Sequence, residues 1–321
     1  DEIDISKCNV KYEDREEIDK WLISKYNSLL KIVTEAYEEY DLNQVVKEIT
    51  NFVYADGIVK HPNGVFYGCS PNAEYLVLPE SMIFINGIFN GVQTVKEPFD
   101  HNSVLIASYA YAGCNYLTSF KCSDSIINAD YMYAASYYSP STEGMTPIVG
   151  NNVVCMNYMY NGQKNMVGEP VCGPHTQYMV YTYRNCTNLT GDPVFPENLG
   201  IGNYNSLPFN WFELKETYKQ YVNDYEWGIG YLENTWEENG EPAWGHPAYT
   251  GVQGTYYGCT NLTGSPVLPS AVWNAQETYV NCNNLTGNPV STPNLRQAYN
   301  LYHGCTNLTG SVNTGIALVL P

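Results

Sequence analysis

Cysteines at a fixed spacing are the residues with the most potential for chemistry. Cys259, Cys282 and Cys305 lie 23 residues apart, and Cys186 opens another copy of the same motif. Thiols at one position per repeat could bind a metal or undergo redox exchange. The chain has no Cys-x-x-Cys, however, and a thiol in an apolar interior behaves as a small hydrophobic side chain. We therefore expect structural free thiols, with no metal site and no cofactor.

Other catalytic patterns are missing from the sequence. There is no His-Glu-x-x-His, no Gly-x-Ser-x-Gly, no phosphate-binding glycine-rich loop and no dinucleotide fingerprint. The acidic group Glu237, Glu238 and Glu241 lacks the Asp-x-Asp spacing of a calcium loop, which favours a solvated turn. We predict no catalytic residues and expect that the protein is not an enzyme.

Aromatic residues are concentrated in one segment, 197–248, which holds four of the six tryptophans. Aromatic rings give contact area at low entropic cost, and insertions in repeat proteins often carry the binding face. The alternative is a local core that only seals the insertion. The residues expected to contact a ligand or partner are Trp211, Trp227, Trp236, Trp244, Tyr225 and Tyr231.

A repeat must position these residues. The last copies share an aromatic-x-x-Cys-x-x-Leu motif followed by Thr-Gly, and the copies at Cys186, Cys259 and Cys282 continue to Pro-Val. Further back, Gln163 and then Pro140 occupy the cysteine position, and a decayed copy covers 216–223. About ten units then fill 59–321. Spacing of three aligns side chains on a 3₁₀-like turn, and proline makes the next stretch extended. We predict a structural ladder formed by Cys186, Cys259, Cys282, Cys305, Leu189, Leu262, Leu285 and Leu308.

The repeat resembles the BspA-like (Treponema-type) leucine-rich repeat, also found in phage fibre-like proteins. The resemblance implies a repeat solenoid of leucine-rich-repeat type, with short parallel strands and 3₁₀ or helical turns. It also implies a non-enzymatic protein at the cell surface that acts in recognition or adhesion. From the recurring proline we expect only two or three paired residues per strand.

The two ends of the chain differ from the repeat. Residues 1–58 carry a helical stripe that includes Trp21, Leu29 and Tyr40, which predicts an N-terminal α-helical cap or, alternatively, an oligomerisation or attachment element. At the other end, an apolar tail has no polar segment behind it. Ile316, Leu318 and Leu320 are therefore expected to form an oligomer interface or to fold back as a cap.

Composition narrows the partners. Fifteen Lys+Arg against 33 Asp+Glu gives a net charge of −18, which argues against nucleic acid. No apolar run reaches the ~20 residues of a membrane helix. Thirty tyrosines against nine phenylalanines predict much aromatic surface.

From these features we predict extracellular recognition or adhesion through a protein or glycan surface ligand, at the cell surface or on a virion. The alternative is a structural assembly subunit, such as a phage fibre, decoration or filament protein, that packs against copies of itself through the C-terminal coil.

Overall fold

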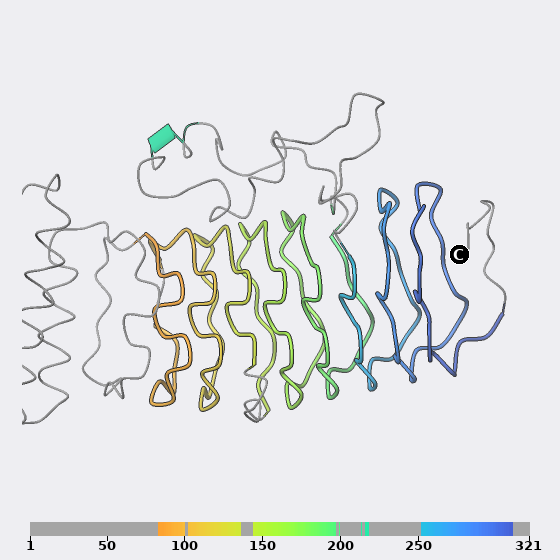
Figure 1. Ribbon diagram of the computed structural model, residues 1–321, viewed down its shortest axis with the longest axis horizontal. Helices are drawn as coiled ribbons and strands as arrows, with labels where there is room; N and C mark the ends of the chain where they lie inside the picture. Colours follow the sequence, from red (N-terminus) through yellow and green to blue (C-terminus); the bar gives the residue numbers. More distant parts are fainter. Residues whose placement is uncertain are drawn as a thin grey trace, which may run out of the picture.

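The computed structural model describes residues 83–99, 102–135, 144–196 and 252–310, together with Leu199, Glu213, Glu216 and Thr217. In these ranges the chain winds into successive coils that stack side by side along the long axis (Figure 1). Among the described residues, helix is confined to Glu213, Glu216 and Thr217. The predicted cap at 1–58 lies outside the described residues.

Parallel pairing between coils is limited to single bridges. One bridge residue per coil pairs with its equivalent in the next coil, in the series Phe84, Ile106, Asn128, Cys155 and Tyr178, and again from Asn274 to Gln297. The prediction of two or three paired residues per strand was therefore too high for these coils. The left-handed residues described below interrupt the extended backbone soon after each bridge, which prevents a longer strand.

A ladder of aromatic rings runs through the interior. Each ring packs on its equivalent in the next coil, with centroids 5.4–5.9 Å apart and planes within 21° of parallel. We call this series the ring ladder: Phe89, Tyr111, Tyr133, Tyr160, Tyr183, Tyr256, Tyr279 and Tyr302. All but Tyr302 are buried. Offset stacking of this kind adds to the stabilisation from burial.

The hydroxyls of the ring ladder explain why tyrosine is used instead of phenylalanine. In Tyr279 the hydroxyl accepts a hydrogen bond from the Val267 N–H at 3.2 Å and donates one to the Val267 carbonyl at 2.6 Å. Tyr256 does the same with Val194, and Tyr302 with Val290. Each of these valines follows a proline or lies next to one. The expectation that tyrosine hydroxyls lie at the water boundary is wrong for this ladder, because the hydroxyls serve backbone groups that no neighbouring strand pairs.

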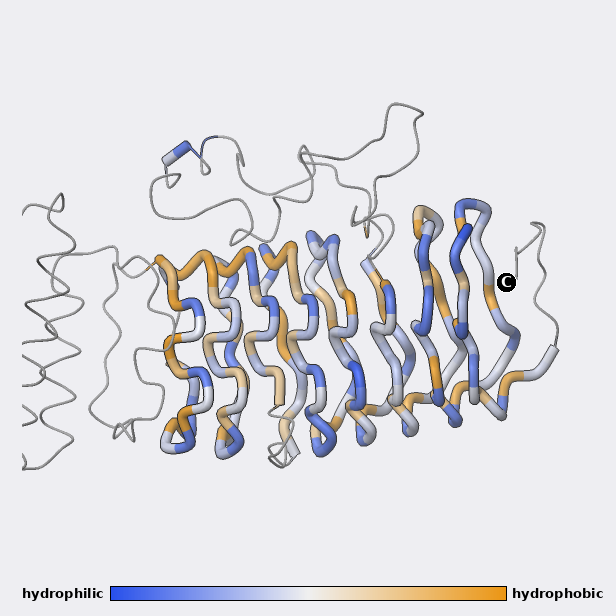
Figure 2. The backbone as a smooth tube through the Cα atoms, in the orientation of Figure 1, coloured by the Kyte–Doolittle hydropathy of each residue, from blue (hydrophilic) through white to orange (hydrophobic). Residues whose placement is uncertain are grey.

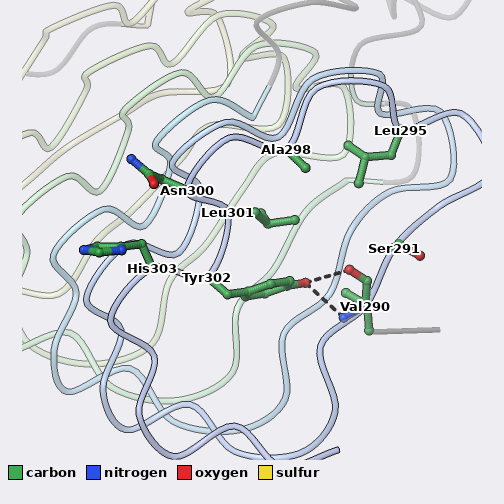
Figure 3. A pocket seen from close by; sticks show the side chains of 8 residues that line it. All are labelled: Val290, Ser291, Leu295, Ala298, Asn300, Leu301, Tyr302 and His303. Carbon is green, nitrogen blue, oxygen red and sulfur yellow. Dashed lines mark hydrogen bonds between the residues drawn. The ribbon is translucent and has the colours of Figure 1, made fainter. Parts of the chain in front are cut away.

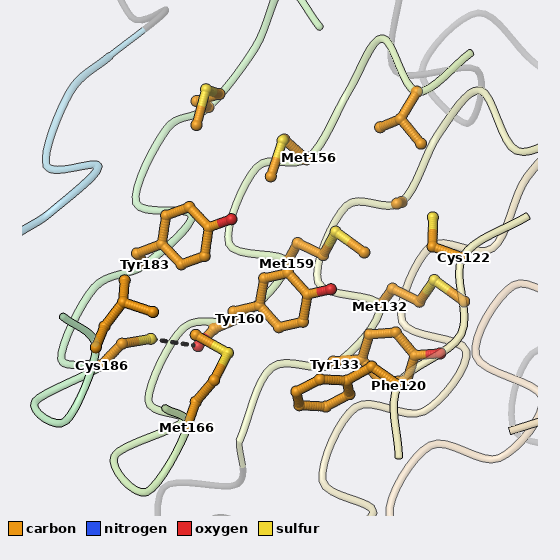
Figure 4. Close-up of a cluster of buried hydrophobic side chains, with 14 of the residues drawn as sticks. Phe120, Cys122, Met132, Tyr133, Met156, Met159, Tyr160, Met166, Tyr183 and Cys186 are labelled. Carbon is orange, nitrogen blue, oxygen red and sulfur yellow. Dashed lines mark hydrogen bonds between the residues drawn. The ribbon is translucent and has the colours of Figure 1, made fainter. Parts of the chain in front are cut away.

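The cysteines have a similar role. Cys186 Sγ donates to the Tyr160 carbonyl at 3.1 Å, as Figure 4 shows beside the stacked rings of Tyr133, Tyr160 and Tyr183. Cys259 and Cys282 donate to the ring residue of the preceding coil in the same way. Gln163 replaces a cysteine and donates to the Tyr133 carbonyl at 2.5 Å. This position therefore requires a donor directed at the preceding coil, and an amide can replace the thiol.

A left-handed residue recurs two positions before each ring. Its φ is 52–59° in every described coil, and the residue is glycine in only two of them. The others are Tyr109, Tyr131, Tyr158, Tyr181, Glu277 and Asn300. A bulky residue in this region is uncommon and costs free energy. The coil geometry imposes it, because the N–H of this residue donates to a carbonyl of the next coil, as in Tyr158 N to Val180 O at 2.8 Å.

Two irregularities differ from the expected spacing. Tyr133 stacks on Tyr160, so the longer interval between them is absorbed among residues 134–159, and Pro140 does not set the ring position. Tyr183 stacks directly on Tyr256 at 5.7 Å, and its N–H donates to Thr255 O. The decayed copy at 216–223 therefore does not form a coil between them, contrary to the expectation from length.

The core is continuous along the described coils. Buried leucines, methionines and cysteines pack against the ring ladder from Ile85 to Leu301 in one cluster. Hydrophobic and hydrophilic residues alternate within each coil, as the colouring of Figure 2 shows. The assignment of these coils to the leucine-rich-repeat type of solenoid stays a prediction.

Candidate functional site

The ladder thiols are poorly suited to chemistry. Burial raises the pKa of the Cys259 and Cys282 thiols well above their usual value, and raises that of Cys305 to about 11. All eight cysteines of the described coils are free. A thiol that stays protonated is a weak nucleophile and a poor metal ligand. In the described ranges, no three His, Cys, Asp or Glu residues are grouped to hold a metal.

The predicted ladder residues lie together in the interior. Cys186, Cys259 and Cys282 are fully buried, as are Leu189, Leu262 and Leu285. Cys305 and Leu308 are partly exposed in the last described coil. The residues predicted to contact a ligand, Trp211, Trp227, Trp236, Trp244, Tyr225 and Tyr231, lie outside the described residues. The predicted interface residues Ile316, Leu318 and Leu320 also lie outside them. These two predictions stay predictions.

Sequence reasoning missed a second row of tyrosines on the outer side of the coils. Tyr109, Tyr131 and Tyr158 stack with centroids 4.4 Å apart, and Tyr181 follows at 5.2 Å with a 34° tilt. We call these four residues the outer tyrosine row. Tyr109 is 41% exposed, and the other three are partly exposed. The available signal was a Tyr-x-Tyr pair in four consecutive copies, with its second tyrosine in the ring ladder.

A buried carboxyl lies beside this row. Asp130 accepts a hydrogen bond from the Asn157 N–H at 2.7 Å, and the Asn157 amide lies 3.4 Å from its other oxygen. Burial raises the pKa of Asp130 to about 7, against the lowering effect of these two hydrogen bonds. This carboxyl therefore titrates near neutral pH.

Arg184 extends the outer tyrosine row. Its Cζ atom lies 5.0 Å from the centroid of the Tyr181 ring and 5.1 Å from that of Tyr257, in the next coil. Burial raises the pKa of Tyr158, and the positive charge of Arg184 opposes this rise. The row thus ends in a cation held between two aromatic rings, an arrangement that is attractive in itself.

A cavity of ≈ 290 Å³ opens at the last described coil. Leu295, Leu301 and Tyr302 line it, and the Tyr302 hydroxyl is bonded to Val290 at its edge (Figure 3). Tyr302 stacks on Tyr279 through one ring face only among the described residues. The cavity is therefore the interior of the last described coil, with no cluster of titratable side chains inside it.

No helix among the described residues is long and apolar enough to cross a membrane.

Comparison with known proteins points to the N-terminal segment. The family model that matches describes the anticodon-binding domain of tRNA ligase, and it covers residues 19–60. The chain is 49% identical over 47 residues to an isoleucine–tRNA ligase of Caldicellulosiruptor bescii, and 48% identical over 44 residues to one of Caldicellulosiruptor saccharolyticus. These matches cover 15% and 14% of this chain but 5% of each ligase. No solved structure matches the chain.

These findings correct the family predicted from the repeat. The expected BspA-like leucine-rich-repeat or phage fibre relationship is wrong, because the matching family is a tRNA ligase domain located before the repeat. A 23-residue interval is the length of chain that completes one stacked coil. Any family that builds such coils needs a similar interval, so the spacing indicates geometry and not ancestry.

The predicted function is corrected for the same reason. Extracellular recognition or adhesion, with a protein or glycan surface ligand, is wrong, and so is the alternative of a self-packing assembly subunit. The exclusion of nucleic acid is also wrong, since the matched family is named for binding an anticodon. The matched part of the ligase is a binding domain of an enzyme family. The predicted extracellular location is not addressed by these matches and stays a prediction.

The charge argument against nucleic acid failed because charge is unevenly distributed. Residues 19–60 contain five lysines and seven carboxylates, a net charge of −2. The described ranges 83–99, 102–135, 144–196 and 252–310 contain five basic and six acidic residues, a net charge of −1. The whole-chain value of −18 describes neither surface. Association with phosphate depends on the charges near the contact.

Proposed function

We propose that this chain is a non-catalytic RNA-binding protein that contacts tRNA through residues 19–60. The observation that carries the proposal is the match of this segment to the anticodon-binding domain of tRNA ligase, with 49% identity over 47 residues to one such ligase. The chain spans about a twentieth of the length of the curated relatives that it matches. Aminoacylation is therefore not part of the proposal.

Local charge supports contact with RNA at this segment. Its five lysines are Lys20, Lys25, Lys31, Lys47 and Lys60, and its net charge is −2. The segment 197–251 contains nine acidic and two basic residues, a net charge of −7. Phosphate would be repelled there and tolerated at residues 19–60.

The coils fit a scaffold role in this proposal. Their interior consists of ring–ring contacts and hydrogen bonds between equivalent positions, and their thiols are buried and protonated. We propose that they form a solenoid that carries the RNA-binding segment. Rigid, nearest-neighbour stacking is the property that such scaffolds use.

Binding of labelled tRNA to the full-length chain tests the proposal. Fluorescence anisotropy is measured across a series of salt concentrations for the native chain, for Lys25→Glu and Lys31→Glu, and for the control Lys96→Glu. Lys96 is exposed on the coils, so its variant makes the same charge change away from the matched segment. We expect the slope of log K against log salt to fall by about 1 for each variant in 19–60, and to stay unchanged for the control. Absence of tRNA binding at low salt, or equal effects of all three variants, would refute the proposal.

A further inference from the structure

Arg184 is held rigidly by groups that do not neutralise its charge. Its guanidinium lies between the rings of Tyr181 and Tyr257. Its backbone N–H donates to Tyr181 O, and its carbonyl accepts from Gly162 N–H at 2.7 Å. Both the backbone and the side chain of this residue are therefore fixed by neighbouring coils.

The donors of this guanidinium lack an acceptor in the protein. Nε of Arg184 is buried and has no hydrogen-bond partner. The nearby carboxylate of Glu277 accepts from the Tyr181 hydroxyl at 2.7 Å, so it is already engaged. Buried donors without acceptors are rare in folded proteins and call for an explanation.

The stacking rings are positioned by several independent features. Tyr181 has a φ of 52°, which is uncommon for a bulky residue. Its hydroxyl also accepts a hydrogen bond from Gln253 Nε2 at 3.2 Å. Gly254 in the next coil leaves space for the ring, because a Cβ there would overlap it. The strained backbone, the hydroxyl contacts and the glycine all keep the Tyr181 ring against Arg184.

We infer that Arg184 is an oxyanion-binding residue that contacts a phosphate group of the bound RNA; this inference rests on the proposed tRNA binding. Stacking occupies the two faces of the guanidinium and leaves its N–H edge for an acceptor. That planar edge matches the oxygens of a phosphate group in a bidentate arrangement. The described coils carry a net charge of only −1, so they do not repel a phosphate strongly.

The Nε–H resonances of arginine provide a direct test on the full chain. There are three arginines, Arg15, Arg184 and Arg296, so the Arg184 signal is assigned by its loss in Arg184→Lys. Inorganic phosphate is titrated at constant ionic strength, with acetate and chloride in parallel. We expect a saturable shift of the Arg184 signal with phosphate and a smaller one with acetate. Arg296, whose Nη1 already donates to Pro293 O, is the internal control and should not shift.

Binding of tRNA separates this inference from the proposed function. Arg184→Gln should lower the salt slope by about 1, as expected for the loss of one phosphate contact. Arg184→Lys should keep the slope but weaken binding, because the charge remains and the planar fork is lost. Thermal melting of each variant confirms that it is folded.

Three results would overturn the inference. The first is an Arg184 signal that ignores phosphate together with an unchanged slope in Arg184→Gln; tRNA binding by residues 19–60 would then still stand. The second is a shift with acetate as large as that with phosphate, which would assign the site to carboxylates. The third is a phosphate shift without any tRNA binding, which would refute both the RNA contact of Arg184 and the proposed function.

Discussion

Removal of a single hydroxyl from the ring ladder should destabilise the coils measurably. In Tyr279→Phe the ring keeps its contacts with Tyr256 and Tyr302, both at 5.7 Å, while the N–H and carbonyl of Val267 lose their partner. Burial raises the pKa of Tyr279 well above its usual value, so the hydroxyl stays a donor throughout the stable pH range. The substitution thus isolates two hydrogen bonds.

The expected magnitude follows from those two bonds. A typical hydrogen bond contributes about 0.5–1.5 kcal/mol net, so the loss of both should lower the free energy of unfolding by about 2 kcal/mol. Val267 is 42% exposed, so water can solvate part of the freed backbone, which places the cost below that of two fully buried groups. The loss should appear as a lower denaturation midpoint at unchanged slope.

Urea denaturation followed by circular dichroism measures this difference. The matched control is Tyr299→Phe, because Tyr299 is 54% exposed and its change should stay within about 0.5 kcal/mol. Tyr256→Phe should behave like Tyr279→Phe, since its hydroxyl holds Val194 across a gap of 62 residues. If Tyr279→Phe is no less stable than Tyr299→Phe, the ladder hydroxyls do not stabilise the coils and this reasoning fails.

Three further predictions concern other positions. The folded-state pKa of Asp130, about 7, lies above the usual carboxyl value near 3.9, so its contribution to stability is present at low pH and is lost as pH rises through 7. Asp130→Asn should therefore melt increasingly above the native protein between pH 6 and pH 8; a constant difference would contradict the assignment. Thiol labelling at pH 8 with mass-spectrometric readout should modify the partly exposed Cys305 before Cys282, which should react only after urea is added. Gly254→Ala should lower the melting temperature by several degrees, because the new Cβ overlaps the Tyr181 ring at a φ of 58°, whereas Ala112→Gly, at a buried position, should cost less.

Much of the coil geometry could be predicted from the spacing of residues. Aromatic, cysteine and leucine positions three apart do form consecutive turns, with Cys259 N–H bonded to Tyr256 O and Leu262 N–H bonded to Cys259 O. The periodicity survives because each coil must place the same side chains against the same neighbours. A donor at the cysteine position is similarly required, which is why glutamine fits at 163.

Other features depended on contacts that spacing does not encode. The distance of 73 residues between Cys186 and Cys259 is close to a multiple of the repeat and predicted an extra coil, but Tyr183 and Tyr256 stack directly. A chain segment can leave the stack wherever two coils complement each other, whatever its length. The outer tyrosine row escaped notice because its members occupy a left-handed position, where propensity argues against tyrosine.

Whole-chain charge and repeat ancestry misled the functional reasoning for one physical reason. Both average over a molecule whose parts differ: residues 19–60 match a tRNA ligase domain and carry a net charge of −2, while 197–251 carry −7. Electrostatic interactions with a phosphate decay within about 8–10 Å at moderate salt, so distant carboxylates barely oppose a local contact. A lysine at position 25 or a clamped guanidinium at Arg184 is therefore governed by its own surroundings. Partner exclusion by net charge is sound only where the acidic residues lie within that range of the binding surface.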